Sequence, residues 1–211
     1  MDSLQTPPAV APVSGKQRLI EAALRLAARE GAALSSLGLR ELAREAGLNH
    51  NTFYRHFGDL DELGQAAAAS VATQLMAALK EIRRNAARHA DATIGSTEYF
   101  LDFVRDNREL VTVGLRELHS TDSPMRRALQ QVLKDIALES VEQITTMNLV
   151  PGIGRDSLFQ ATSAITYYML YRGLDYLEQP RQRRVIRDEI VDFIRAQFMG
   201  RIALQAAIRK P

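Results

Sequence analysis

The segment LRELAREAGLNHNTFYRHF, residues 39–57, decides how the rest of the chain is interpreted. Its first eight residues favour a short helix, and Gly47 suits the left-handed backbone conformation that follows a helix end. Asn49 can cap a further short helix that runs to about His56. Two short helices joined by a tight, glycine-containing turn form a helix-turn-helix. The sequence therefore predicts this motif, with Phe53 in its core.

In a helix-turn-helix the second helix enters the major groove of DNA, where its first side chains meet base edges and flanking polar groups meet phosphates. The predicted base contacts are Asn49, His50, Asn51 and Thr52, and the predicted contacts at the sugar-phosphate strand are Tyr54, Arg55 and His56. The alternative is a pair of amphipathic helices in an ordinary helical core, with the tyrosine and the arginine solvated outside.

Outward from this segment, apolar residues repeat at helical spacing along the whole chain, with no alternating strand pattern and no internal repeat. We predict an all-α protein of about nine helices. The predicted units are a flexible tail (1–13), a three-helix helix-turn-helix DNA-binding domain (14–58) and a larger ligand-binding and dimerisation domain (59–211). Ser14 is expected to cap the first helix and Gly31 to end it, and Asp59 to open a long helix that links the two domains.

Composition agrees with this interpretation. The chain has 211 residues, of which 29 are Ala and 26 are Leu, and it has no cysteine. The missing cysteine excludes disulfides, thiolate zinc sites, iron–sulfur ligation and cysteine nucleophiles. Apolar runs are too short to cross a bilayer, so we expect a cytoplasmic protein without a membrane partner, associated with the nucleoid when bound to DNA. The net charge is +2, and residues 1–57 hold the whole excess, with seven basic and five acidic side chains.

The sequence gives little support for catalysis or for metal binding. The histidines at positions 50, 56, 89 and 119 lack the spacing of metal ligands, and no Ser/His/Asp triad is visible. The glycines of residues 151–155 follow no predicted strand, which indicates a turn between helices rather than a phosphate loop. We therefore expect no enzyme activity, no catalytic residue, no metal site and no cofactor.

Residues 16–64 resemble the DNA-binding domain of the TetR family of bacterial transcriptional regulators. The resemblance rests on a first helix that ends at Gly31, then on LRELAREAGL, FYRHF and DLDEL. Two positions depart from the family pattern: Gly38 replaces the usual Ser or Thr cap, and Gly58 replaces a basic residue that often touches phosphate. Phosphate binding is therefore expected to depend on Lys16, Arg18, Arg40, Arg44 and Arg55, although Arg44 can equally pair with a neighbouring glutamate.

A fainter resemblance joins FYRHFGDLDELG and residues 102–120 to the branch of that family that represses unsaturated fatty acid synthesis and senses acyl-CoA or acyl carrier protein thioesters. It implies a long-chain acyl-CoA effector and a role for Arg116 and Glu117 in ligand binding or interdomain signalling, with a surface ion pair as the alternative. Basic residues for the headgroup would be Arg105, Arg108 and Arg116.

The larger domain offers a candidate pocket and a candidate interface. A pocket between helices of a bundle would be lined by residues on the apolar stripes, each of which can equally be ordinary core. The candidates are Phe100, Phe103, Val113, Met125, Leu129, Val132, Phe159, Thr162, Thr166 and Met169. The last two helices carry apolar residues on more than one side, which predicts a four-helix dimer interface through Tyr167, Tyr171, Ile186, Ile190, Phe193 and Phe198.

Together these features predict a homodimeric repressor that binds a palindromic double-stranded operator and responds to a small apolar effector, with acyl-CoA control of fatty acid desaturation genes as the specific hypothesis. One alternative is a related repressor of an efflux or catabolic gene with another apolar ligand. Alternatives of another class are a helical enzyme and an interaction module that binds no DNA.

Overall fold

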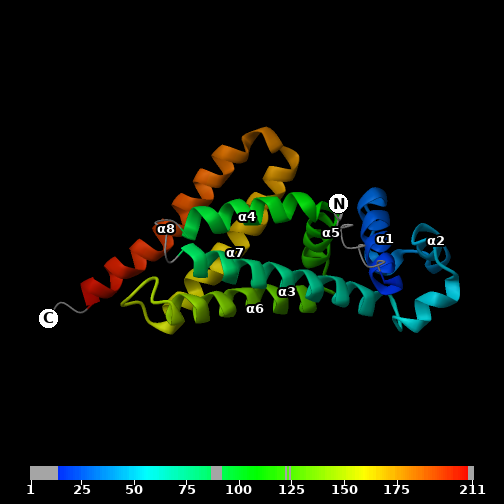
Figure 1. The fold of residues 1–211 in the computed structure, drawn as a ribbon, viewed down its shortest axis with the longest axis horizontal. Helices are drawn as coiled ribbons and strands as arrows, with labels where there is room; N and C mark the ends of the chain where they lie inside the picture. Colours follow the sequence, from blue (N-terminus) through cyan, green and yellow to red (C-terminus); the bar gives the residue numbers. More distant parts are fainter. Residues whose placement is uncertain (1–13, 87–91, 122, 124, 209–211) are drawn as a thin grey trace, which may run out of the picture.

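The computed structural model describes residues 14–86, 92–121, 123 and 125–208, and every regular element in these ranges is a helix (Figure 1). The α-helices are α1 (Gly15–Glu30), α2 (Leu39–Glu45), α3 (Leu60–Ala86), α4 (Ala92–Asp106), α5 (Arg108–His119), α6 (Met125–Thr146), α7 (Arg155–Glu178) and α8 (Arg183–Ile208). Short 3₁₀ helices are η1 (Leu34–Ser36), η2 (His50–Arg55) and η3 (Pro180–Gln182). The all-α prediction is confirmed, and the predicted tail at residues 1–13 lies outside the described residues.

Local capping sets the ends of the first helices. The Ser14 hydroxyl accepts a hydrogen bond from the Gln17 N–H at 3.2 Å, and Gly31 ends α1 in the left-handed conformation. At the start of α3, Asp59 Oδ1 accepts from the Glu62 N–H at 2.8 Å. These caps stand where the sequence predicted them.

The elements form two parts that share α3. One part comprises α1, η1, α2 and η2, and the other is a bundle of α3 to α8 (Figure 1). α3 has 27 residues, so it begins beside the small part and then packs along α6 and α4. The end of α8 projects from the bundle on the side away from α1 (Figure 1). No helix in the described ranges is long and apolar enough to cross a membrane.

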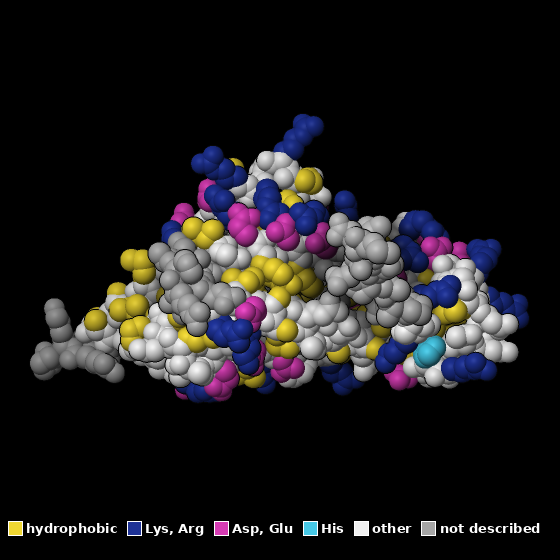
Figure 2. Space-filling view, in the orientation of Figure 1, with side chains coloured by type: hydrophobic (Ala, Val, Ile, Leu, Met, Phe, Trp, Pro, Cys, Tyr) yellow, Lys and Arg dark blue, Asp and Glu magenta, His cyan; other side chains and the backbone are white. Residues whose placement is uncertain are grey.

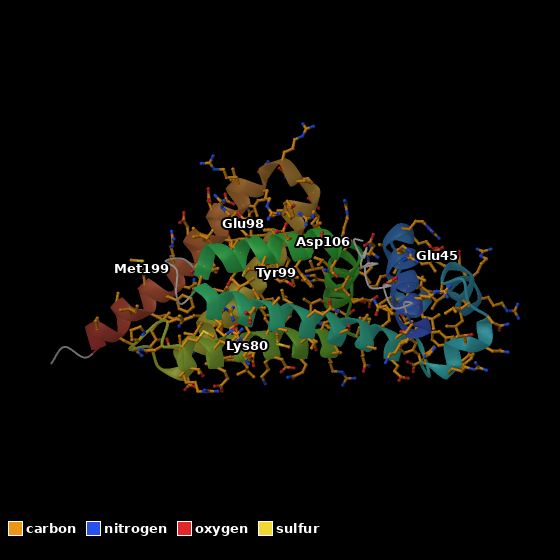
Figure 3. The ribbon with its side chains drawn as sticks, viewed as in Figure 1. Glu45, Lys80, Glu98, Tyr99, Asp106 and Met199 are labelled. Carbon is orange, nitrogen blue, oxygen red and sulfur yellow. The ribbon has the colours of Figure 1, made fainter. Side chains whose placement is uncertain are left out.

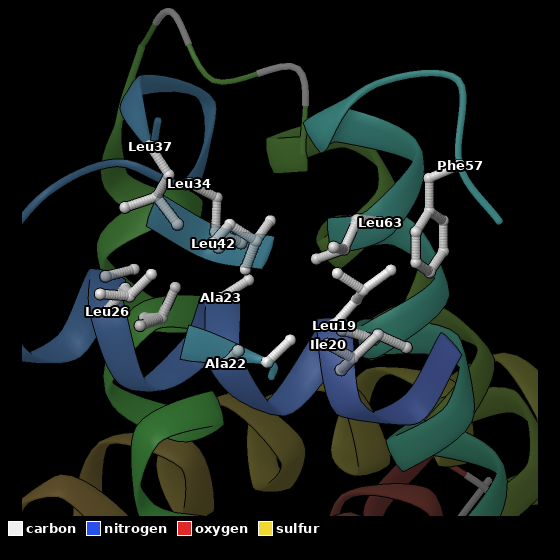
Figure 4. Close-up of a cluster of buried hydrophobic side chains, with 14 of the residues drawn as sticks. Leu19, Ile20, Ala22, Ala23, Leu26, Leu34, Leu37, Leu42, Phe57 and Leu63 are labelled. Carbon is white, nitrogen blue, oxygen red and sulfur yellow. The ribbon is translucent and has the colours of Figure 1, made fainter. Parts of the chain in front are cut away.

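Two cores hold these parts together. The first surrounds Leu19, Leu26, Leu42 and Leu63 (Figure 4), and it also includes two residues of the bundle, Val113 and Met125. The second lies among α4, α5, α7 and α8. Because the first core takes side chains from α5 and α6, the small domain is packed directly on the bundle.

Candidate functional site

The turn of the helix-turn-helix is held by a glycine and by an arginine from α1. Gly47 has a φ of +62°, in the left-handed region, and the Leu48 N–H donates to the Ala43 carbonyl oxygen at 2.8 Å. Arg18 Nη2 donates to the Gly47 carbonyl oxygen at 3.0 Å, and it lies 2.6 Å from the place that a Cβ of residue 47 would take. Both the backbone conformation and the space therefore require glycine. Arg18, predicted at a phosphate, is bound to the turn here.

Gly47→Ala should destabilise the protein more than Gly31→Ala. Both glycines are left-handed, which costs alanine roughly 1–2 kcal/mol, but nothing lies within 4 Å of a Cβ at Gly31. At Gly47 the new methyl must also displace Arg18 from its hydrogen bond, a further loss of about 1 kcal/mol. Urea unfolding of both variants measures the difference in free energy. Equal losses would show that Arg18 does not stabilise the turn.

The second element of the motif, η2, is a 3₁₀ helix, where the sequence predicted a short helix without its type. Only eight residues separate Leu48 from Phe57, and both of these side chains pack in the first core. The segment between them closes with short-range bonds, such as the Thr52 N–H to the Asn49 carbonyl oxygen at 2.8 Å. Asn49 caps the element as predicted, because its Oδ1 accepts from the Asn51 N–H at 3.0 Å.

The side chains of η2 and its flanking residues differ in how far they are buried. Phe53 is fully buried, whereas the next residue, Tyr54, is 59% exposed. The exposed members of the predicted DNA-binding set in this segment are Asn49, Asn51, Tyr54 and Arg55, and the half-buried members are His50, Thr52 and His56. His56 lies against the start of α1, where a Cβ at Gly15 would be 3.1 Å from its Nε2. The motif thus presents amide, hydroxyl and guanidinium groups to solvent from a fixed apolar base.

The basic residues of this domain differ in their partners. The Lys16 Nζ lies 5.4 Å from the centroid of the Phe57 ring. Arg44 faces Glu41 at 3.6 Å, the alternative that the sequence left open. Arg40 and Arg55 are exposed and make no ion pair within the described residues. These two are the cations most available to an anionic partner, and the predicted DNA contacts remain a proposal.

Arg116 and Glu117 join the two domains and do not line the main cavity. Arg116 Nη1 donates to the carbonyl oxygens of Ala27 at 3.0 Å and Ala32 at 2.9 Å, at the end of α1. Glu117 is 2% exposed, and its Oε1 accepts the Leu34 N–H at 2.8 Å. The prediction that these residues bind ligand is corrected, and the alternative of a role between the domains stays open: α5 turns their side chains toward α1 and η1, where they satisfy the carbonyl oxygens of Ala27 and Ala32 and the Leu34 N–H.

Further polar groups gather at this junction. The Ser123 hydroxyl donates to the Glu117 carboxylate. Burial, Asp59 and Glu117 all raise the pKa of Asp61 at the start of α3. A raised carboxyl pKa means that the folded state binds the proton more tightly, so stability falls as the pH rises through that pKa. The negative charges of Glu117 and Asp61 therefore interact at the junction.

A cavity of about 520 Å³ runs through the bundle. Nine of the twelve predicted ligand residues line it, namely Phe100, Phe103, Val113, Met125, Leu129, Val132, Thr162, Thr166 and Met169. Phe159 does not; it packs with Leu158 and Val141 in a separate cluster at the end of α6. Figure 2 shows apolar side chains gathered in a hollow between α3 and α4. Tyr99 of α4 packs near α3 with Leu75 and Leu79 (Figure 3).

Arg83 of α3 is a cavity residue that sequence reasoning missed. Its Nη1 donates to Gln143 Oε1 at 2.6 Å, and its Nη2 lies 3.4 Å from the Ser140 hydroxyl. Burial lowers the pKa of Arg83 to about 10, although the nearby Glu139 raises it, so the guanidinium stays charged at neutral pH. The available signal was its position: Arg83 follows Leu79 by four residues on the apolar stripe of α3.

The predicted dimer residues separate into two groups. Tyr167 and Tyr171 are 41% and 43% exposed. Ile186 and Ile190 are buried in the second core of the same chain, so their assignment to an interface is wrong. Phe193 is half-buried and stacks on Tyr168, and Phe198 is half-buried at the cavity; neither is freely exposed. The exposed apolar side chains of α8 are instead Val185, Met199, Ile202 and Leu204.

Three solved structures are similar to this chain at low sequence identity. A putative TetR-family transcriptional regulator from Syntrophomonas wolfei has a TM-score of 0.71 and 14% identity, covering 88% of this chain and 95% of the other. A transcriptional regulator from Rhodococcus sp. Rha1 has a TM-score of 0.66 and 20% identity, and the match covers 90% of this chain and 98% of the other. The fatty acid degradation regulator FadR from Bacillus halodurans has a TM-score of 0.64 and 12% identity, and the match covers 82% of this chain and 96% of the other. These likenesses show the fold, and the similar proteins are named as regulators.

The family comparison concerns the N-terminal segment. Residues 19–67 match the family described as "Bacterial regulatory proteins, tetR family". The matched segment covers the core of α1, the helix-turn-helix and the start of α3. Residues 19–67 therefore match the tetR family of bacterial regulatory proteins, on a chain whose all-helical fold is similar to that of TetR-type regulators.

Proposed function

We propose that this protein is a ligand-responsive transcriptional repressor that binds a palindromic DNA operator as a homodimer. The observation that carries the proposal is the geometry of η2, in which a buried Phe53 fixes the exposed side chains of Asn49, Asn51, Tyr54 and Arg55. Amide side chains can read base edges, and tyrosine and arginine can bind phosphates. Such a protein acts on the chromosome, so its place is the cytoplasm, at the nucleoid when bound.

The cavity and the DNA-binding domain share side chains, which supports a response to ligand. Leu24, Ala67, Val113 and Met125 line the cavity and also pack in the first core. Met125 presses on Gly64 of α3 so closely that a Cβ there would lie 2.3 Å from its sulfur. A ligand that moves these side chains shifts the support of α1 and α3, and this provides a coupling between effector and operator.

Asn51→Ala and Arg55→Ala should weaken DNA binding in different ways. Loss of a base contact costs about 1–3 kcal/mol on the operator and little on random duplexes. Loss of a phosphate contact weakens all sequences alike and lowers the salt slope by about one. Fluorescence anisotropy at several salt concentrations measures both, with Lys134→Ala, exposed on α6, as the control. An unchanged affinity for both variants, or no salt-dependent binding by the wild type, would favour the rival interaction module.

A second copy of the chain is the proposed partner of the outer face of α7 and α8. Tyr167 and Tyr171 on α7 and the exposed apolar residues of α8 are unusual for a free surface. Apolar atoms follow the projecting end of α8 in Figure 2, and Met199 is labelled there in Figure 3. Two helices from each copy would form a symmetric four-helix interface and place two helix-turn-helix units on one operator.

Met199→Glu should give a folded monomer, whereas Ile190→Glu should unfold the bundle. Met199 is 68% exposed, so its charge would be buried only in the dimer, but Ile190 is already buried within one chain. Sedimentation equilibrium and circular dichroism distinguish the two results. A dimer that survives Met199→Glu unchanged would place the interface on another surface.

The proposed effector belongs to the fatty acyl class, and the sequence prediction named long-chain acyl-CoA. The apolar lining favours a long chain, since each buried CH₂ contributes about 0.8 kcal/mol. Of the basic residues predicted for the headgroup, Arg105 pairs with Asp102 and Asp106, and Arg116 caps α1. The lining of the cavity therefore supports the acyl-chain part of the proposal, while Arg105 and Arg116, predicted for a coenzyme A headgroup, already have partners. The similar FadR of Bacillus halodurans is a fatty acid degradation regulator.

A further inference from the structure

Arg83 is the one charged side chain among the described residues that line the cavity. The other polar groups of the lining are hydroxyls, and two of them, on Ser96 and Ser140, lie in the helices packed beside this end of α3. The cavity is thus apolar over most of its length and cationic at one place. A pocket of this kind orients a ligand through a few convergent polar groups.

No carboxylate forms an ion pair with Arg83 in the described residues. Its two hydrogen-bond partners, Gln143 and Ser140, are uncharged. Glu139 is one side chain farther away, because Gln143 Nε2 donates to Glu139 Oε1 at 3.0 Å. Arg183, by contrast, meets the Glu98 carboxylate at 2.6 Å. A guanidinium has five N–H donors in a planar fork that suits a carboxylate, and a buried charge is costly without a counter-charge.

Ser96 provides a second observation at the same end of the cavity. Its Oγ is buried and has no hydrogen-bond partner within the described residues, and the residue lines the cavity. The preceding residue, Gly95, is packed against α3: a Cβ at Gly95 would lie 3.3 Å from Ile82 Cγ2, next to Arg83. Buried hydroxyls rarely lack a partner. Two adjacent helices therefore offer an unused hydroxyl on Ser96 and a guanidinium without an ion pair on Arg83.

The cavity extends from this polar end toward the DNA-binding domain. Ala67 and Arg83 both line it from α3, and the helical rise of 1.5 Å per residue puts them about 24 Å apart along the axis. Near Ala67 the lining is Leu24, Val113 and Met125, without a charge. The length and the one-sided polarity fit a chain with a single polar terminus.

We infer that the cavity takes a fatty monocarboxylate, with the carboxylate on Arg83 and Ser96 and the apolar tail directed toward Val113 and Met125. This inference rests on the proposed function for its regulatory meaning, but the binding site stands on the cavity alone. It changes the expected headgroup from a coenzyme A thioester to a free acid. A thioester has no negative charge at its carbonyl and would leave the guanidinium without a directly bound counter-charge.

Isothermal titration of the full-length protein without DNA tests the inference with three probes of equal chain length: dodecanoate, dodecan-1-ol and dodecanoyl-CoA. Wild-type protein should bind dodecanoate at least tenfold more tightly than either other probe. Arg83→Met should remove that preference and leave the affinity for dodecan-1-ol within twofold, and Arg83→Lys should keep part of it. Arg84→Met is the matched control, because Arg84 is exposed and pairs with Glu81.

Each other outcome overturns the inference. These outcomes are equal affinity for acid and alcohol, tighter binding of the thioester, an unchanged acid preference in Arg83→Met, or no binding of dodecanoate. Thermal melting of ligand-free Arg83→Met shows whether the variant is folded. Ser96→Ala tests the same site without removing the cation, and this variant should bind dodecanoate several-fold more weakly. A protein that prefers the acid but binds no DNA would refute the proposed regulator alone.

Discussion

Phe53→Ala should destabilise the DNA-binding domain by about 3–5 kcal/mol and abolish operator binding. Phe53 is fully buried in the first core, where its ring packs near Phe57 at 5.9 Å between centroids. Removal of a buried aromatic ring loses its transfer free energy and leaves a cavity. This loss is a large fraction of the 5–15 kcal/mol that stabilises most domains. Urea unfolding monitored by circular dichroism measures it.

Tyr54→Ala is the matched control, since Tyr54 follows Phe53 in the chain and its side chain is mostly exposed. It should change the free energy of unfolding by less than about 0.5 kcal/mol while it weakens DNA binding. The two variants distinguish Phe53, which positions the exposed side chains of η2, from Tyr54, which is proposed to contact DNA. Similar stability losses in both variants would contradict the arrangement of η2.

The second large effect is expected at the domain junction. Arg116→Ala removes two charge-assisted hydrogen bonds, to the carbonyl oxygens of Ala27 and Ala32, each worth roughly 1.5–3 kcal/mol. Glu117→Ala leaves the buried Leu34 N–H without an acceptor, at about 1–3 kcal/mol. Both variants should make the DNA-binding domain unfold before the bundle. They should also reduce the effector-induced change in operator affinity from the usual 5- to 150-fold range to within twofold.

Conservative and distant changes provide the controls for this junction. Glu117→Gln keeps an acceptor for the Leu34 N–H and should retain most of the coupling. Arg108→Ala lies on the same helix but is exposed. Calorimetry of unfolding and operator titration with and without dodecanoate measure the two effects. A single cooperative transition with full coupling in Arg116→Ala would show that the junction does not connect the domains.

The parts of the fold that depend on local signals were predictable. Caps at Ser14 and Asp59, the left-handed glycines and the helical stripes act within a few residues, so the sequence indicates them directly. The type of η2 was not predictable, because α and 3₁₀ helices share the same cap and differ only in how the segment fits between its anchors. The described residues contain eight α-helices and three 3₁₀ helices, close to the expected nine helices.

The candidate site could not be predicted from local sequence signals alone, because it depends on tertiary packing. An apolar stripe shows that Ile186 and Ile190 are buried but not whether the burial is in their own chain or a partner's. The charges of Arg116 and Glu117 are similarly ambiguous, because a capping interaction with α1 and η1 spans more than 80 residues of sequence. Arg83 interrupts an apolar stripe, and only the packing of α3 against α4 and α6 reveals that it lines the cavity.

Selection of bound duplexes from a random DNA library tests the central claim most directly. The proposed regulator should enrich a palindrome whose two half-sites are separated by one helical turn or a multiple, about 34–36 Å per turn. Asn51→Ala should relax the preference at a symmetric pair of positions, and Met199→Glu should enrich no palindrome. A wild-type protein that enriches no sequence above the starting library would contradict the assignment of residues 39–57 as an operator-reading helix-turn-helix.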